Sequence, residues 1–327
     1  VYKRQIQGAL RQFIQNANAV SGANSTVFRI PAAQLQATID GGGGTVMLIR
    51  PASALPVVTD ASTTIDGSTQ TTYTTDTNNA VAEVTTGPEV IIDLQGLIVG
   101  EGIEVNANSV TIDSIGITGT DGAGTNAVEI EAGVTGAIVQ NSTLFSTYAS
   151  ALKLETGAAN NQFLNNVLRE AGTGSASADG YAFGGSNTGN TFSGNQVIDS
   201  AGYGIDVVTG GGNNNNTFSN NLIKGSGTSG SQLAGIAFRG GDNNTVSSNT
   251  ITENAGVGIL VIDGDTGNLI SQNSIFNNGG LGVDLNTAGG SVGDGVTAND
   301  PADGDGFGGN LLQNFPVITS AVWNGAN

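Results

Sequence analysis

The sequence of 327 residues contains no cysteine and no histidine. Without cysteine, no disulfide supports the fold, and the redox compartment cannot be read from the composition. Without histidine, the chain lacks the side chain that most often acts as a general acid or base, and it lacks the commonest metal ligand. A Ser-His-Asp arrangement is therefore excluded.

Positive charge is also scarce. Nine basic residues stand against 27 acidic ones, and the formal net charge is −18. A phosphate-binding surface needs clustered Lys and Arg, so we expect no nucleic acid and no anionic membrane as a partner. Divalent cations, neutral glycans and other protein subunits remain compatible with such a chain. No apolar run approaches ~18 residues, so we expect no membrane-spanning helix.

Two short patterns alternate along most of the sequence. The first is a small residue, an apolar residue, any residue and a second apolar residue. It starts at Gly102, Ala127, Ala151, Gly180, Gly204, Gly235, Gly258 and Gly282. The second is a pair of asparagines five positions apart, followed by an apolar residue two positions later. Both are period-2 patterns that are too short for helices, and they predict short strands joined at sharp Gly and Asn corners.

A coil of about 27 residues that holds two or three such strands cannot bury its inward side chains alone. Stacking the coils buries these side chains in one axial core and pairs each strand with its equivalents ~4.8 Å away. We therefore predict an all-β fold, a single-stranded parallel β-helix. Two interior columns are expected. One contains Ile103, Val128, Leu152, Tyr181, Ile205, Ile236, Ile259 and Val283, and the other contains Val110, Ile138, Phe163, Phe192, Phe218, Val246 and Ile270.

The recurrent asparagines have a structural explanation. One asparagine per coil at a corner can donate and accept amide hydrogen bonds along the stack, each contributing ~1 kcal/mol net. We therefore predict a structural ladder of Asn166, Asn195, Asn221, Asn249 and Asn273.

The ends of the chain differ from the repeats. One face of an amphipathic helix is formed by Ile6, Leu10, Phe13, Ile14 and Ala17, and this helix could cover the open end of the first coil. The domain organisation that we expect is a capping helix in 1–20, first coils in 21–67, a projecting loop in 68–88, regular coils in 89–290, and an acidic glycine-rich loop with a C-terminal strand in 291–327, leading toward further domains.

Three segments carry a resemblance to a known group of proteins. They are Ala9–Ala19 with the following Val27–Pro31, the stretch Ala54–Gly67, and the closing Asn310–Ile318. They resemble segments of large bacterial surface proteins with right-handed parallel β-helix repeats of the pectin-lyase-like superfamily. The resemblance implies right-handed coils and an extracellular or cell-surface location. It implies no catalytic residue, because the group is defined by its architecture.

Pectin-cleaving members of this superfamily make an active site worth seeking. The middle position of the first pattern points outward and holds Glu104, Glu129 and Lys153 on successive coils. In-register stacking would bring together Glu129, Glu131, Lys153 and Glu155. Carboxyl groups ~5 Å apart suit a retaining glycosidase. However, stacked Glu and Lys are also typical of a charge-compensated solvent face, and we favour this interpretation.

Acidic, glycine-rich turns supply oxygen ligands of the kind that Ca²⁺ requires. The main candidate is the group Asp300, Asp303 and Asp305, and a second is the pair Asp263 and Asp265. A polar Asp-Gly turn is the alternative for both. Calcium is the one cofactor that we expect.

The sequence therefore favours a non-enzymatic extracellular module that is structural or adhesive, such as a surface rod, filament or matrix subunit. Its expected partners are other subunits or domains of the same assembly. A polysaccharide lyase or hydrolase is the first alternative, and a glycan-binding rod without catalysis is the second.

Overall fold

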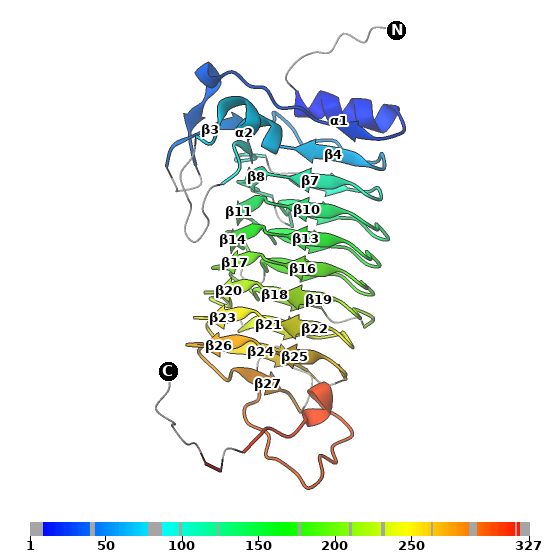
Figure 1. Cartoon of the computed structure of the whole chain (residues 1–327), viewed down its shortest axis with the longest axis vertical. Helices are drawn as coiled ribbons and strands as arrows, with labels where there is room; N and C mark the ends of the chain where they lie inside the picture. Colours follow the sequence, from blue (N-terminus) through cyan, green and yellow to red (C-terminus); the bar gives the residue numbers. More distant parts are fainter. Residues whose placement is uncertain are drawn as a thin grey trace.

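The computed structural model of the protein describes residues 9–39, 43–77, 87–97, 100–122, 124–175, 178–208, 211–229, 233–262, 264–287, 293–317 and 319–320. These residues form one elongated rod of stacked coils (Figure 1). In each coil, short strands alternate with tight corners, and the strands of successive coils pair to form three long sheets. The fold is the predicted right-handed parallel β-helix.

Sheet I follows the order of the chain along the rod. Its strands are β1 (Asn24–Ser25), β4 (Thr63–Asp66), β7 (Thr111–Asp113), β10 (Ile138–Gln140), β13 (Gln162–Leu164), β16 (Thr191–Ser193), β19 (Thr217–Ser219), β22 (Thr245–Ser247) and β25 (Leu269–Ser271).

Sheet II lies beside it. Its strands are β2 (Gln36–Ala37), β3 (Thr45–Ile49), β5 (Val90–Asp93), β8 (Ile115–Thr118), β11 (Thr143–Thr147), β14 (Val167–Ala171), β17 (Gln196–Ile198), β20 (Leu222–Lys224), β23 (Thr250–Thr252) and β26 (Ser274–Phe276). The pair β2–β3 is antiparallel, whereas β3 and β5 already pair in the parallel sense of the rod.

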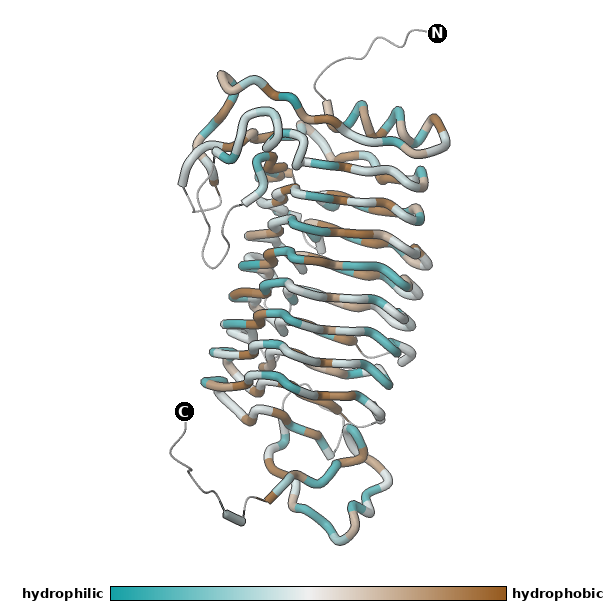
Figure 2. The backbone as a smooth tube through the Cα atoms, viewed as in Figure 1, coloured by the Kyte–Doolittle hydropathy of each residue, from teal (hydrophilic) through white to brown (hydrophobic). Residues whose placement is uncertain are grey.

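Sheet III closes the coil. Its strands are β6 (Ile103–Val105), β9 (Val128–Ile130), β12 (Leu152–Leu154), β15 (Tyr181–Phe183), β18 (Ile205–Val207), β21 (Ala234–Phe238), β24 (Val257–Val261) and β27 (Val283–Leu285). In Figure 2, apolar positions recur from coil to coil, with polar positions between them.

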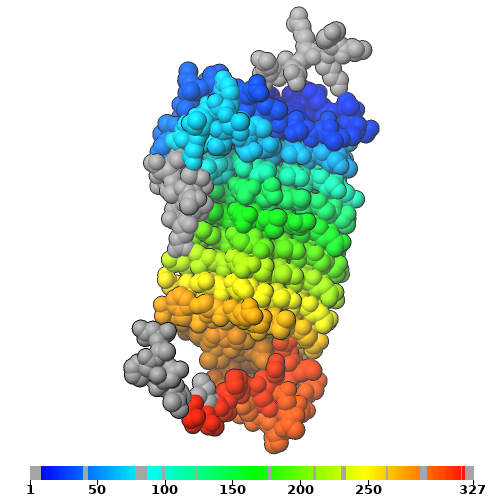
Figure 3. Space-filling model, viewed as in Figure 1, coloured from blue at the N-terminus to red at the C-terminus, as the bar shows by residue number. Residues whose placement is uncertain are grey.

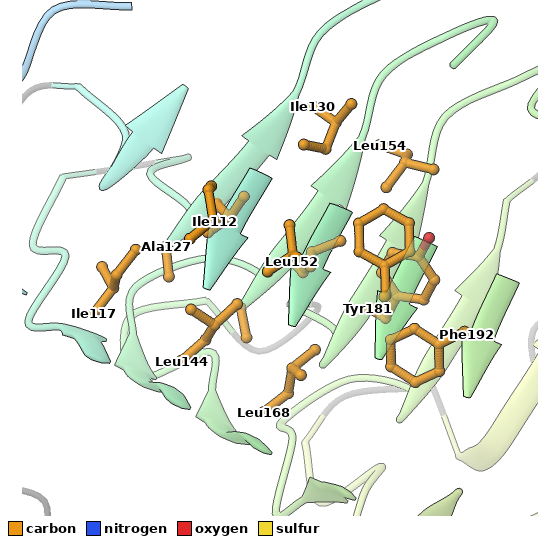
Figure 4. Close-up of a cluster of buried hydrophobic side chains, with 14 of the residues drawn as sticks. Ile112, Ile117, Ala127, Ile130, Leu144, Leu152, Leu154, Leu168, Tyr181 and Phe192 are labelled. Carbon is orange, nitrogen blue, oxygen red and sulfur yellow. The ribbon is translucent and has the colours of Figure 1, made fainter. Parts of the chain in front are cut away.

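The first column is confirmed as a continuous stack, which is interior from Ile103 to Ile259 and exposed only at its last member, Val283. Each of its eight members pairs with the next across sheet III, from Ile103 with Val128 to Ile259 with Val283. Figure 4 shows Leu152, Tyr181 and Phe192 directed into the space between the sheets. The rings of Tyr181 and Phe192 stack there with their centroids 4.5 Å apart.

The second column is correct from Phe163 onward but wrong in its first two members. Phe163 pairs with Val139, and Val139 pairs with Ile112, so Val110 and Ile138 do not belong to the column. The alignment of these two coils was wrong because asparagine is found at two adjacent positions of the corner, the left-handed one and the ladder one. Asn141 occupies the left-handed corner with φ 51°, and the next residue stands at the ladder position.

Helix α1 (Leu10–Ala19) lies across the first coil (Figure 1). Its residues Leu10, Ile14 and Ala17 are buried, because they follow the helical period of the predicted apolar face.

The segment predicted as a projecting loop, 68–88, begins instead with α2 (Ser68–Thr74). Within this helix Gln70 is fully buried, and its side chain accepts a hydrogen bond from the Ile30 amide and donates one to the Ile30 carbonyl. These bonds tie the segment to the first coil. A 3₁₀ turn, η1 (Ala32–Gln34), follows Ile30.

The C-terminal strand expected within 291–327 is not tested, because residues 318 and 321–327 lie outside the described residues. Among the described residues after Leu285, the regular element is the 3₁₀ turn η2 (Gly309–Leu312). Here the Asn310 side chain accepts a hydrogen bond from the Asn268 amide and donates one to the Asn268 carbonyl. Side-chain hydrogen bonds thus take the place of strand pairing at this end.

Candidate functional site

Charged side chains gather on the outer face of sheet III, near the N-terminal end of the rod. Glu104, Glu129 and Lys153 occupy the central positions of β6, β9 and β12, and they are direct neighbours in register. Because successive residues of a strand point to opposite faces, the apolar residues on either side of each one enter the core. The strand pattern therefore places these three charges in a row on the surface.

Lys153 is the cation of this cluster. Its ammonium group lies 3.1 Å from Oε1 of Glu129 and also forms an ion pair with Glu155. Burial by itself would lower the pKa of Lys153, but its hydrogen bonds to Glu155 and Glu129 raise it. Lys153 therefore stays protonated, and its ammonium group is already ion-paired with both Glu129 and Glu155.

Glu131 belongs to a neighbouring pair. It shares a hydrogen bond with Glu104, and burial together with this contact raises the pKa of Glu104. Of the four residues expected to meet on this face, the structure thus joins Lys153 to Glu129 and Glu155, and it joins Glu131 to Glu104.

The sequence analysis missed one member of the cluster, Glu101. It lies in the turn before β6, where its carboxylate accepts a hydrogen bond from the Asn126 amide. It also shares a hydrogen bond with Glu129, and burial with the nearby Glu129 charge raises the pKa of Glu101 to about 8. The sequence could have indicated Glu101 through its position just before Gly102 in the repeat, because in-register stacking brings this turn next to Asn126.

The carboxyl groups of the cluster contact one another directly. Glu129 shares hydrogen bonds with both Glu101 and Glu155, and burial raises the pKa of Glu129. Burial opposes ionisation of Glu155 as well, but its hydrogen bond to Lys153 lowers the pKa of Glu155. The arrangement is a closed chain of hydrogen bonds in which Glu101 supplies a proton and Lys153 supplies a positive charge.

A second charged group lies further along the same face. The Arg239 guanidinium forms two hydrogen bonds with the Asp206 carboxylate, of 2.8 and 2.5 Å, and its Cζ lies 5.3 Å from the centroid of the Tyr203 ring. The buried Asp179 accepts a hydrogen bond from the Tyr203 amide at 2.7 Å. Burial and the charge of Asp206 raise the pKa of Asp179. Sequence reasoning missed this group, since its members come from non-equivalent positions of different coils.

The five asparagines of the predicted ladder are linked without interruption. From Asn166 to Asn273, the Oδ1 atom of each later asparagine accepts hydrogen bonds from both the backbone amide and Nδ2 of the preceding one, at 2.8 to 3.1 Å. A parallel ladder stands at the preceding corner and contains Asn161, Asn190, Asn216, Asn244, Asn268 and Asn310. These side chains are structural.

The acidic loop near the C-terminal end is organised by its own hydrogen bonds. Oδ1 of Asp300 accepts one from Nδ2 of Asn314 at 3.3 Å, and Oδ1 of Asp303 accepts one from the Asn314 amide at 2.7 Å. Within the described parts of the chain, Asp300, Asp303 and Asp305 do not form a cluster of three that could hold a metal ion. Calcium binding at this loop remains a prediction.

The second calcium candidate is only partly described. Asp265 is buried, and its Oδ1 accepts a hydrogen bond from the Gly241 amide at 2.8 Å. Burial raises the pKa of Asp265 to about 6. Its expected companion, Asp263, lies outside the described residues.

A polar groove runs between α2 and the corner where sheets I and II meet. Its volume is about 630 Å³, and hydroxyl and amide side chains line it, including Thr71, Asn141, Asn165 and Gln196.

In the part of the chain that the structure describes, no helix is long and apolar enough to cross a membrane.

Several known proteins share features with this chain. It is similar to pectate lyase Pel9A, with 13% identity, 88% of this chain and 76% of that chain covered, and a TM-score of 0.49. It is also similar to a mutant of the periplasmic alginate epimerase AlgG, with 12% identity, 73% of this chain and 60% of that chain covered, and a TM-score of 0.41. A third similar structure is PfbA, a surface adhesin of Streptococcus pneumoniae, with 15% identity, 82% of this chain and 78% of that chain covered, and a TM-score of 0.36. No curated protein sequence matches the chain.

One family matches most of the sequence. Its profile, described as periplasmic copper-binding protein (NosD), covers residues 64–287, which include the coils that carry both asparagine ladders and the charged face. The chain therefore belongs to the NosD family of β-helix proteins.

Proposed function

We propose that this protein is a non-enzymatic structural or adhesive rod that acts outside the cytoplasm. The family description places its members in the periplasm, and the resemblance to bacterial surface proteins points to the same side of the inner membrane. Other subunits or domains of the same assembly are its proposed partners.

The self-paired state of the Lys153 cluster carries this proposal. A glycosidase needs two carboxyl groups on either side of the scissile bond, about 5 Å apart or further. Here the carboxyl group of Glu129 shares hydrogen bonds with those of Glu101 and Glu155, which is a closer approach than the spacing of a glycosidase pair. The most obvious lyase base, Lys153, is bound by two carboxylates. The cluster therefore compensates its own charge.

The copper named in the family description does not fit this chain. Copper sites in proteins are built from imidazole, thiolate and thioether ligands. The sequence has no His and no Cys, and its single Met, Met47, is 1% exposed in the core. Carboxylates are the remaining charged ligands, and in the described residues no three of them form a group that could hold a metal ion. We propose that this family member does not bind copper.

Polysaccharide cleavage is the second candidate function, and one observation favours it. Glu101, with its pKa raised to about 8, keeps a proton at neutral pH beside Glu129, and a general acid needs such a proton. If a substrate displaced Lys153 and separated Glu101 from Glu129, these two carboxyl groups could serve as acid and base.

The experiment that separates the two candidates is an activity assay. Pectin, alginate and neutral glucans are incubated with the protein, and reducing ends and unsaturated products are measured over time. We expect no release above the rate without protein. Sustained release that Glu129→Gln or Lys153→Ala abolishes, while Lys224→Ala retains it, would establish the enzyme and remove the structural proposal.

A further inference from the structure

The two ends of the rod carry opposite charge. The described residues from 9 to 52 contain three basic residues and no acidic residue, whereas the described residues from 264 to 305 contain six aspartates and no basic residue. Figure 3 shows these described parts, in blue and in orange to red, at opposite ends of the molecule. The charge of the chain is therefore polarised along its long axis.

Positive charge between the ends is already compensated. The four basic residues after Arg50 each form an ion pair with a carboxylate of the rod. They are Lys153, Arg169, Lys224 and Arg239. With a net charge of −18, the sides of two copies repel each other. Arg50 also pairs with Asp93, so the basic side chains without an ion pair among the described residues are Arg11 and Arg29, and these belong to the N-terminal end.

The C-terminal end exposes apolar surface. In the last coil, the side chains of Leu269, Phe276 and Val283 are 56%, 47% and 38% exposed, although Ile259, one coil earlier in the Val283 column, is fully buried. The next coil, which would cover them, is replaced by the turns of residues 293–317.

A cavity of about 300 Å³ opens between this last coil and those turns, and its lining is largely apolar. Leu281, Val283, Leu285, Val296, Leu312 and Phe315 line it. The carboxyl group of Asp284 also borders the cavity, and its buried Oδ1 has no hydrogen-bond partner among the described residues. That oxygen is out of reach of another copy, but Asp294 and Asp303 are exposed, so the end combines apolar surface with accessible carboxylates.

The N-terminal end offers a matching set of groups. Among the described residues before β3, the side chains of Val20, Val27 and Ile39 are 44%, 63% and 40% exposed, and Arg29 is exposed as well. This end thus presents apolar side chains and basic groups on the outside of the first coil.

From these features we propose that copies of this chain associate end to end, with the basic N-terminal end of one rod on the acidic C-terminal end of the next. The proposal rests on the structural role proposed above and names a second copy as the partner. A contact between two different surfaces of the same chain leaves one of each surface open, so it builds filaments rather than closed dimers.

The first test is the mass of the protein in solution, measured by light scattering and sedimentation across a range of concentrations. At low salt the average mass should rise with concentration. At about 1 M NaCl the average mass should return to that of the monomer, because the Debye length is then only ~3 Å and charges further apart no longer attract each other. A protein that stays monomeric at every concentration in low salt would overturn the proposal.

Two variants at opposite ends decide the geometry. Arg29→Glu reverses a charge at the N-terminal end, and Val296→Asp places a charge in the C-terminal cavity, where Val296 is 69% exposed. Each variant alone should lose the association, and an equimolar mixture should form dimers and nothing longer. Lys224→Glu, which makes the same charge change between the ends, should assemble as the wild type does.

Other outcomes contradict the proposal. Wild-type association of Arg29→Glu would indicate a symmetric contact between two C-terminal ends, and the same result with Val296→Asp would exclude the cavity. Both positions are exposed, and unchanged melting curves confirm that the variants fold. A protein that stays monomeric would contradict the end-to-end association but not the proposed non-enzymatic role. That role is tested separately by the polysaccharide assay, which does not depend on the mass of the protein.

Discussion

Nδ2 of Asn221 donates a hydrogen bond of 2.9 Å to Oδ1 of Asn249, one coil further along the rod. The same Oδ1 also accepts from the Asn221 amide at 2.9 Å, and Oδ1 of Asn221 accepts in the same way from Asn195. Each asparagine thus fixes the spacing of two coils. The ladder holds polar groups that the corner would otherwise leave buried and unpaired.

Replacing Asn221 should destabilise the rod. Asn221→Ala leaves the Asn195 amide and the Phe192 carbonyl without their partner, and each unpaired buried group costs ~1–3 kcal/mol. The measurement is the midpoint of thermal or denaturant unfolding.

The control for this variant is Asn215, an exposed corner residue with φ 58°. Asn215→Gly should have little effect, since glycine adopts this conformation without strain. Asn215→Ala should lower stability less than Asn221→Ala, because it adds backbone strain of ~1 kcal/mol but leaves no buried group unpaired. Equal midpoints for Asn221→Ala and the wild type would exclude the ladder as a stabilising element.

Tyr181 should tolerate loss of its hydroxyl group. The side chain is fully buried, and among the described residues its hydroxyl has no hydrogen-bond partner. Tyr181→Phe keeps the ring stacked on Phe192 and removes the unpaired group, so stability should rise by ~1 kcal/mol. Tyr203→Phe is the control and should bring no such gain. A lower melting temperature for Tyr181→Phe would show that the hydroxyl is bonded in solution.

The stability of the rod should depend on the protonation of Glu101. Burial raises its pKa from 4.5 to about 8, so the folded protein keeps a proton that the unfolded chain releases above 4.5. This contribution to stability is complete below about pH 4.5 and is lost as the pH rises through about 8.

A neutral replacement tests this dependence. Glu101→Gln can accept from the Asn126 amide and donate to Glu129 at any pH, so its melting temperature should fall less between about pH 5 and pH 9 than that of the wild type. Glu253→Gln, at a corner where Glu253 pairs with Lys224, is the matched control. Parallel curves for Glu101→Gln and the wild type would contradict the assignment of the proton to Glu101.

Calcium binding at the acidic loop is testable by melting curves. Millimolar Ca²⁺ should raise the unfolding temperature by binding the folded form, and Mg²⁺, which demands octahedral geometry, should act less. Asp303→Asn should reduce the response, whereas Asp121→Asn, far from this loop, should retain it. Identical curves with Ca²⁺ and with a chelator would remove Asp300, Asp303 and Asp305 as a site.

The copper proposal predicts a different result for a different ion. Cu²⁺ added under the same conditions should leave the melting temperature unchanged after correction for nonspecific effects, measured with a second acidic protein that also lacks His and Cys. A stoichiometric, tight complex in a calorimetric titration would contradict it.

The sequence by itself determined the β-helix, the eight members of the sheet III column and the row of Glu104, Glu129 and Lys153. It could do so because period-2 strands, repeated every 23 to 31 residues, leave one way to bury the apolar positions.

Tertiary structure decided which polar groups meet. Whether Glu131 reaches Lys153 or Glu104, and whether Glu101 keeps a proton, depends on the burial of each side chain and on the path of the turns between the coils, and the repeat specifies neither. The same holds at the corners, where asparagine suits both the left-handed position and the ladder position beside it. The sequence placed Asn166 in the ladder, but only the stacking of the coils showed that Asn141 takes the left-handed position and leaves the ladder position to Ser142.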